Sequence, residues 1–322
     1  MDRVLLGFIV VFGVPALTVL YAFLIEFILG RMPNTASRRL RPWLWIAPAL
    51  ILLITFLVYP TIRTIAYSFQ NANATEYVGF DNYRFGLTSP EMRTAFQNNL
   101  IWLAVYPAVT LTIALLVAVL ADRVKYEGLI KAVVFIPMAI SYVAAGVIWK
   151  LMYEFRPPSR DQVGTVNALI DTFGGTPTPV LISYPSNNVW LIVIGIWMYV
   201  GFATIILSAG LKSIPIELME ASRIDGASEW NIFRHITLPL LSSTIAVVLT
   251  TMIISVLKIF DVIYVMTNGN FRTEVIAVRM YKELFTFHHL GRASMIATLL
   301  LLLTIPVMLY NIRRFTAQEE LR

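Results

Sequence analysis

Seven long apolar runs constrain this chain more than any other feature of its sequence. Each has the roughly 20 mostly apolar residues that a helix needs to cross a bilayer. A backbone in lipid must satisfy its own hydrogen bonds, so each run is expected to be helical. The chain is therefore predicted to be an all-α polytopic membrane protein. The expected spans are residues 4–29, 43–67, 98–121, 130–152, 188–211, 240–264 and 294–312.

Composition agrees with this class and argues against others. The 322 residues are 58% hydrophobic and 14% charged, whereas soluble domains average roughly 45–50% and about 25%. The chain has no cysteine, and its three histidines have no partner at ligand spacing, so no metal site is expected. A net charge of +6 is typical of cationic cytoplasmic loops, so nucleic acid is not an expected partner. No pair of acids and no Ser-His constellation shares a membrane depth, so no catalytic residues are expected.

The connections between the runs predict how the chain is oriented. On one side they carry 13 Lys and Arg residues, against 9 on the other. Because cytoplasmic loops are enriched in these residues, the N-terminus is predicted outside and the C-terminus inside. The first run is too long for a signal-peptide core and lacks a small-residue cleavage site, so it is predicted to be a retained span.

Two of the outer connections contain apolar patterns that predict short helices. One is the sequence NALIDTF within residues 153–187, and the other is EVIAVRMYKELF within residues 270–293. Both patterns are amphipathic, so both segments are expected to lie at the membrane interface.

The segment ELMEASRIDGASEWNIFRHITLPLL, residues 217–241, is unusually polar for a connection between two spans. Pro215 can open a helix at its first turn. Glu217 and Glu220 then complement the helix dipole, and Asp225-Gly226 provides a glycine C-terminal cap. The segment is therefore predicted to begin with a short cytoplasmic helix.

A second helix is predicted directly after this cap. Trp230, Phe233 and Ile236 are expected along one of its faces, and Leu238-Pro239 is expected to turn the chain into the next span. Two short helices that protrude from the membrane suit docking into a groove of a soluble partner. A solvated amphipathic loop without a partner is the alternative that periodicity alone leaves open.

The spacing within this segment resembles the signature loop of permease subunits of bacterial ATP-binding-cassette importers. That signature has Glu-Ala-Ala, three residues, Gly, nine residues, and Ile-x-Leu-Pro. Ser222 replaces the third residue of the triplet, which is a change between small side chains. The matching positions are Glu220, Ala221, Ser222, Gly226, Ile236, Leu238 and Pro239.

Further segments are similar to the carbohydrate branch of these importers, which includes maltose, glycerol-phosphate and α-glucoside permeases. They are FIPMAISYVAAGVIWKLMY at 135–153, GLKSIP before the signature, and KIFDVIYVMTNG at 258–269. The resemblance implies a six-helix importer core over residues 43–322, with a coupling loop at 215–239. Residues 1–42 are then an extra N-terminal transmembrane helix and a basic cytoplasmic loop.

The resemblance also implies an assembly in a bacterial inner membrane. Its expected partners are a second related permease, two copies of a cytoplasmic ATPase subunit and an extracytoplasmic sugar-binding protein, besides the lipid bilayer. The chain has no Gly-rich phosphate loop. ATP and Mg are therefore expected on the ATPase partner, with no cofactor on this chain, which is not expected to be an enzyme.

A sugar path needs aromatic faces and hydrogen-bonding groups inside the bundle. Lys258 and Asp261 have helical neighbour spacing, and an ion pair that locks helices together or snorkels to the outer surface is favoured over contact with the substrate. By similarity to the maltose-type permease, the other path residues lie on three spans. The candidate path residues are Met138, Tyr142, Gly195, Met198, Tyr199, Phe202, Ser255, Val256, Lys258 and Ile259.

The leading hypothesis is therefore the permease subunit of an ATP-driven importer for a carbohydrate, an oligosaccharide or a glucoside. An importer permease for a non-sugar solute is the first alternative, because the cytoplasmic loop alone does not exclude it. A secondary transporter is the second, but it predicts charged relays and inverted repeats. Neither is found in the sequence, and that class leaves the loop unexplained.

Overall fold

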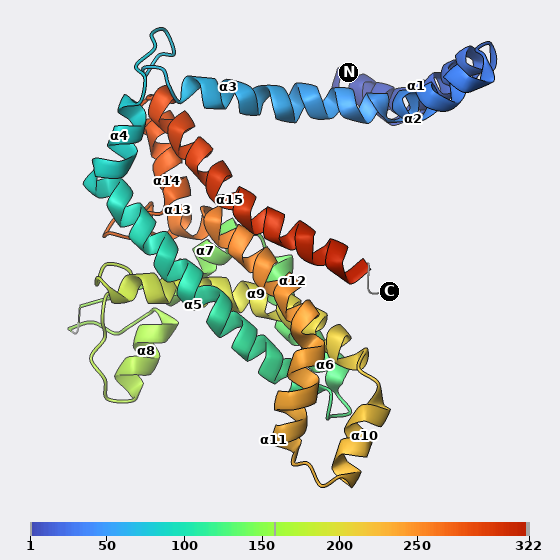
Figure 1. Cartoon of the computed structure of the whole chain (residues 1–322). Helices are drawn as coiled ribbons and strands as arrows, with labels where there is room; N and C mark the ends of the chain where they lie inside the picture. Colours follow the sequence, from blue (N-terminus) through green and yellow to red (C-terminus); the bar gives the residue numbers. More distant parts are fainter. Residues whose placement is uncertain (1, 158, 320–322) are drawn as a thin grey trace. The chain divides into compact units, whose positions relative to one another are not determined.

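The computed structural model describes residues 2–157 and 159–319 and divides the chain into two compact units, Met1–Ala66 and Tyr67–Arg322 (Figure 1). The described residues form helices and one isolated bridge between Gln70 and Tyr77. In chain order the α-helices are α1 (Asp2–Gly30), α2 (Asn34–Leu53), α3 (Tyr59–Tyr67), α4 (Asp81–Thr88), α5 (Pro90–Ala121), α6 (Glu127–Phe135), α7 (Tyr142–Met152), α8 (Thr165–Thr172), α9 (Ser186–Lys212), α10 (Ile216–Ile224), α11 (Glu229–Ile232), α12 (Leu238–Leu257), α13 (Asp261–Thr267), α14 (Ile276–Tyr281) and α15 (Leu290–Glu319).

Six helices are long and apolar enough to cross a membrane, and a bent pair of helices brings the number to seven. This confirms the predicted all-α polytopic class. The six are Val11–Gly30, Asn34–Tyr67, Pro90–Ala121, Ser186–Lys212, Glu229–Leu257 and Leu290–Arg313.

The first unit is a helical hairpin. Glu26 on α1 accepts hydrogen bonds from Arg41 at 3.0 Å and from Trp45 at 3.1 Å on α2. Tyr21 donates to the Leu44 carbonyl at 2.5 Å. Most side chains described in this unit are exposed, as expected for helices that face lipid. The boundary between the units falls after Ala66, whereas the sequence predicts the core to begin at residue 43.

The core of the second unit forms where α5 packs against α9. Trp102 and Tyr106 on α5 are buried, and Gly195 on α9 lies against them. A Cβ atom added at Gly195 would lie 3.1 Å from each of the two rings. Gly201 is closer still, because its Cβ would lie 2.2 Å from the Val134 carbonyl oxygen on α6. Small residues thus let α9 approach both neighbours, as is common between membrane helices.

The sequence predicts one continuous helix over residues 130–152, but the structure has two helices separated by a bend. A 3₁₀ turn, Ile136–Ala139, follows α6, and the chain then bends by 98° before α7 begins. Ile140 is extended, and the Ser141 hydroxyl accepts a hydrogen bond from the Ala144 N–H at 3.1 Å. Pro137 lacks the N–H that a continuous helix would need, and Ser141 caps a new helix, so the span breaks between them.

The predicted span 240–264 also differs from the structure at both ends. Helix α12 stops at Leu257, and α13 starts only at Asp261. At the other end, Leu238-Pro239 does not turn the chain, because the helix runs unbroken from Glu229 to Leu257. A π-helical turn at Phe233–Thr237 precedes Pro239 and accommodates its missing N–H.

Of the two predicted outer helices, one is exposed and the other is buried. The first is α8, whose apolar side chains Val166, Leu169 and Ile170 are half-buried or exposed. The second is α14, in which Ile276, Ala277, Val278 and Arg279 are all buried. Helix α14 packs against α5 and α15, so its apolar side chains face the protein core.

Candidate functional site

The first candidate site is the pair of short helices α10 and α11, which form the lower tip of the second unit in Figure 1. Gly226 has φ = +81°, a conformation that glycine adopts at little cost. Its N–H bonds to the Arg223 carbonyl at 3.1 Å, and the Ala227 N–H bonds to the Ser222 carbonyl at 3.0 Å. These two bonds form a Schellman cap that ends α10.

The next helix, α11, starts at Glu229, three residues after this glycine. The Ser228 hydroxyl accepts a hydrogen bond from the Asn231 N–H at 3.3 Å and so caps α11. The two caps satisfy backbone groups at the end of α10 and at the start of α11.

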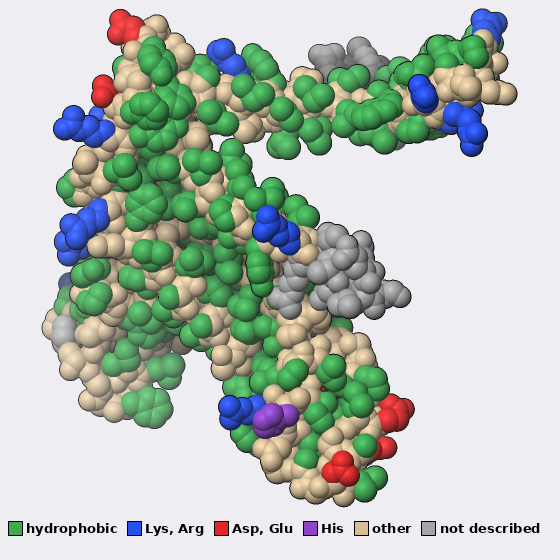
Figure 2. Space-filling view, viewed as in Figure 1, with side chains coloured by type: hydrophobic (Ala, Val, Ile, Leu, Met, Phe, Trp, Pro, Cys, Tyr) green, Lys and Arg blue, Asp and Glu red, His purple; other side chains and the backbone are tan. Residues whose placement is uncertain are grey.

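Apolar side chains are exposed along this tip, and one of them, Trp230, belongs to the helix that continues into the Glu229–Leu257 span. The exposed fractions are 86% for Ile224, 65% for Trp230, 57% for Ile216 and 46% for Leu218. Acidic side chains lie beside the apolar ones on the same tip (Figure 2). An exposed apolar patch with a polar rim is typical of a surface that binds another protein.

Ion pairs connect the tip to the neighbouring connection between α5 and α6. Glu229 pairs with Arg223 at 2.8 Å and with Arg123 at 3.4 Å. Its hydrogen bond to Arg223 raises the pKa of that guanidinium. Lys212, at the end of α9, pairs with Glu127 at 2.6 Å and with Asp122 at 3.7 Å. Two of the segments predicted to share the cytoplasmic side, residues 122–131 and 212–234, therefore lie together at one end of this unit.

The structure gathers most of the predicted signature residues at this tip. Glu217, Glu220 and Asp225 are exposed on or beside α10, and Ser222 donates to the Leu218 carbonyl at 2.8 Å. The later signature residues Ile236, Leu238 and Pro239 lie instead on the helix that leads into the membrane.

The second candidate site is a cleft of about 200 Å³ in the second unit. Six of the ten predicted path residues line it. They are Tyr142, Gly195, Ser255, Val256, Lys258 and Ile259. The cleft lies between the start of α7, the middle of α9 and the break between α12 and α13.

The other four predicted path residues do not line the cleft. Met198 and Tyr199 are buried in the core, where the Tyr199 ring packs 5.1 Å from that of Phe202 and 6.3 Å from that of Tyr106. Met138 lies in the 3₁₀ turn before the 98° bend. The bend places Met138 away from the cleft, and the burial of α9 places Met198 and Tyr199 in the core. The predicted path residues therefore do not share one wall.

Four residues of the lining were missed by sequence reasoning. They are Tyr106, Phe260, Asp261 and Val262. Nothing in the sequence separates Tyr106 from the many aromatics that anchor spans at the interface. Asp261 carried a signal, its spacing from Lys258, but the break at Leu257 removes the helical neighbour relation on which that interpretation depended.

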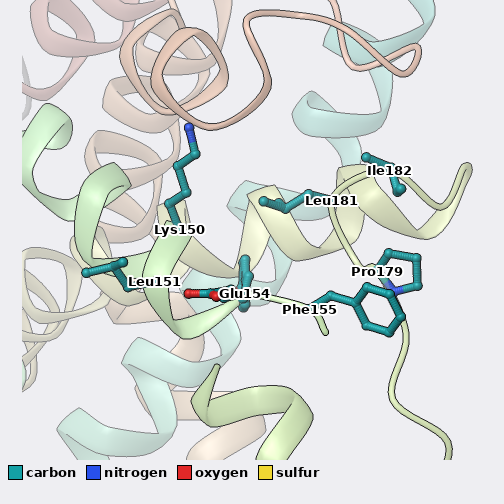
Figure 3. A pocket seen from close by; sticks show the side chains of 8 residues that line it. Lys150, Leu151, Glu154, Phe155, Pro179, Leu181 and Ile182 are labelled. Atoms are coloured by element: carbon teal, nitrogen blue, oxygen red, sulfur yellow. The ribbon is translucent and has the colours of Figure 1, made fainter. Parts of the chain in front are cut away.

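A separate cavity of about 480 Å³ lies at the end of α7 (Figure 3). Phe155 and Pro179 lie side by side in its wall, and the Lys150 ammonium points away from the Glu154 carboxylate. Glu154 pairs instead with Arg156 at 3.5 Å. Most of this lining is apolar, so the cavity offers few of the converging polar groups that a sugar site needs.

The chain thus combines a polytopic helical core, an exposed helical tip at one end and a cleft at two helix breaks. It belongs to the family of binding-protein-dependent transport system inner membrane components, whose model matches residues 110–317. The family is a transport component of the inner membrane rather than an enzyme, and the matched region includes the tip and every residue that lines the cleft except Tyr106.

Relatives match along most of their length. The chain is 48% identical to the osmoprotective compounds uptake permease protein GgtC of Synechocystis, over 87% of this chain and all of that protein. It is 40% identical to the alpha-glucoside transport system permease protein AglF of Rhizobium meliloti, over 90% of this chain and 88% of that protein.

A solved structure matches the fold. It is that of a bacterial ABC transporter involved in import of the acidic polysaccharide alginate, with a TM-score of 0.76 and 22% identity. The match covers 87% of this chain and 98% of the other. At this identity the likeness shows the fold of an importer permease.

Proposed function

We propose that this chain is the membrane-spanning permease subunit of an ATP-driven importer, and that it forms the path for a carbohydrate, an oligosaccharide or a glucoside. The names of relatives that take up osmoprotective compounds and α-glucosides support this class of substrate. The cleft agrees with it, since aromatic and hydrogen-bonding groups line the same wall.

The observation that carries the proposal is the exposed tip formed by α10 and α11. The residues of the signature form a Schellman cap at the end of α10, and Ser228 caps α11. The apolar side chains of the tip are exposed. In the proposal this tip docks into a groove on a separate ATPase subunit, which supplies the energy. Closure of the ATPase pair then moves the spans between inward-facing and outward-facing forms.

The assembly in this proposal has four kinds of subunit. This chain pairs with a second related permease, and two copies of the ATPase, with ATP and Mg, dock beneath them. An extracytoplasmic sugar-binding protein delivers the substrate. The family description, which names binding-protein-dependent transport, supports the last of these partners.

The test is purification of the tagged chain with its partners, followed by reconstitution in lipid vesicles. Recovery of an ATPase and a second permease is expected, with ATP hydrolysis stimulated by a sugar-loaded binding protein. Glu220→Lys is expected to abolish this stimulation while the chain remains in the membrane, because Glu220 is exposed on α10. Glu91→Lys, at an exposed position at the start of α5, is the matched control and should retain stimulation. Wild-type stimulation in a stably assembled Glu220→Lys complex would contradict the proposed coupling role.

A further inference from the structure

Two helix breaks meet at the cleft. Helix α12 ends at Leu257, and Lys258 to Phe260 form an irregular turn before α13. The other break lies at Ile140, before Tyr142 starts α7. Helices α7 and α13 pack closely, since a Cβ added at Gly146 would lie 2.8 Å from the Val265 Cγ1 atom. Broken membrane helices are tolerated where they are buried in protein or line a water-filled cavity.

Lys258 and Asp261 bring opposite charges to this cleft without pairing to each other. Both side chains are exposed and both line the cleft. Neither takes part in any ion pair between residues that the structure describes. The favoured interpretation from sequence, an ion pair that locks helices together, is therefore wrong. Helix α12 ends at Leu257, before both residues, and Asp261 starts α13, so they are no longer neighbours on one face of a helix.

The unpaired charges are available to a solute. Lys258 and Asp261 lie just beyond the span that ends at Leu257, where a charge can face water, a partner charge or a substrate. A carboxylate accepts several hydrogen bonds and an ammonium donates three. Together they match a solute that presents both donor and acceptor groups, as neighbouring hydroxyls do.

The presence of one positive and one negative side chain in the cleft limits the charge of the solute that it favours. An anionic solute would be attracted by Lys258 but repelled by Asp261, and a cationic solute would meet the reverse. A neutral polyol can hydrogen-bond to both. The rest of the wall contains the rings of Tyr106, Tyr142 and Phe260. The cleft of about 200 Å³ is smaller than the roughly 300–1,000 Å³ of sites for drug-sized ligands, so it suits one sugar ring at a time.

The geometry points to Lys258 and Asp261 as the specificity-determining residues of the path, which bind the hydroxyls of a neutral sugar as it passes the cleft. This inference rests on the proposed function and deepens it, because it names the charge class of the substrate and the two residues that recognise it. Asp261 accepts from neighbouring hydroxyls, and Lys258 donates to a hydroxyl oxygen.

The test uses the complete importer in vesicles with its binding protein. Uptake of radiolabelled sucrose and trehalose is measured together with ATP hydrolysis, and the two rates give sugar molecules imported per ATP. Asp261→Asn and Lys258→Met are compared with the wild-type chain. Asparagine keeps the size of Asp261 and can still start α13. Glu154→Gln and Lys150→Met, at the separate cavity, are matched controls with the same changes of charge.

The expected result is a selective loss of transport. Each cleft variant should import at least about tenfold less sugar per ATP, the effect of losing one charged hydrogen bond. ATP hydrolysis stimulated by the loaded binding protein should stay near the wild-type rate, because the tip is unchanged. The two control variants should keep the wild-type ratio, and the wild-type importer should discriminate against a uronic acid and an amino sugar.

Three results would overturn the inference. A wild-type ratio in both cleft variants would remove Lys258 and Asp261 from the path. Failure of both variants to assemble, with rescue by the exchange Lys258→Asp with Asp261→Lys, would identify a structural ion pair. Preferential uptake of a charged sugar by the wild-type chain would contradict the neutral class. If the wild-type importer carries no sugar at all, the proposed function itself is wrong. This result differs from the three above, in which the importer carries sugar but the inference about Lys258 and Asp261 is wrong.

Discussion

The tip and the cleft differ in how far apart in the sequence their parts lie. The tip is built from a single segment, residues 215–239, in which each turn depends on residues next to it. The cleft needs Tyr106, Tyr142, Gly195 and Asp261, which come from four separate helices. The tip is exposed, whereas much of the wall of the cleft is buried.

This difference has a consequence for mutations. A change in the tip should alter docking without unfolding the chain, because local structure outside the core opens at little global cost. A change beside the cleft should lower the stability of the whole second unit, because its helices are close-packed. The following substitutions test that contrast, from the largest expected effect to the smallest.

Gly201→Val should have the largest effect, on stability. The new Cβ would lie 2.2 Å from the Val134 carbonyl oxygen and 2.6 Å from the Phe135 Cα, and backbone atoms cannot rotate away. Overpacking of this kind costs about 3 kcal/mol. The free energy of unfolding in detergent and the amount of chain in the membrane should both fall. Gly128→Val is the control, because nothing lies within 4 Å of its Cβ position. Equal stability of the two variants would mean that α9 and α6 are not tightly packed.

Gly226→Pro should come next, with loss of transport rather than of the fold. Proline fixes φ near −65° and has no N–H, whereas Gly226 has φ = +81° and donates to Arg223. Sugar uptake should fall at least about tenfold, which corresponds to ~1.4 kcal/mol. Gly174→Pro is the control, because Gly174 also follows a helix with a positive φ but lies in an outer connection. Stimulated ATP hydrolysis should therefore be lost only in Gly226→Pro.

The same contrast explains how much of the molecule can be predicted from its sequence. The all-α class and the approximate spans follow from apolar length, and the glycine cap at Gly226 follows from local spacing. The break at Ile140 was not predicted, because the run 130–152 is mostly apolar and long enough for a single span. Its cause is Pro137 combined with the Ser141 cap, both of which lie in the middle of the run.

The cleft was predicted in part. Positions taken by similarity, such as Tyr142 and Ser255, line it, whereas Met198 and Tyr199 turn into the core. One face of a helix can line a cavity while another packs against neighbouring helices. When the helix is apolar on all sides, its sequence does not show which face does which. Tyr106 was missed for this reason, since its place in the wall depends on how closely α5 approaches Gly195.

A pair of serine substitutions compares the two regions with the same change. Ser141→Ala removes the cap of α7 beside the cleft, and Ser228→Ala removes the cap of α11 in the tip. Loss of a cap costs ~1 kcal/mol. We expect the free energy of unfolding of the second unit to fall by that amount only in Ser141→Ala. Ser228→Ala should leave global unfolding unchanged and lower stimulated ATP hydrolysis. Equal changes in thermal unfolding would show that tip and core unfold together.

Glu229→Gln should have the smallest effect, and its dependence on salt makes it informative. The substitution removes the ion pairs with Arg223 and Arg123, which tie the tip to the end of α5. All three side chains are about half-exposed or more, so water and salt already weaken the attraction. Uptake at physiological salt, where the Debye length is about 8 Å, should change by less than about twofold. Lower ionic strength strengthens the pairs in the wild-type chain, so the difference between variant and wild type should grow there. Glu76→Gln, at an exposed outer position, should show no such dependence. A large loss of uptake that is the same at every salt concentration would mean that Glu229 acts through direct contact with the ATPase rather than through its ion pairs.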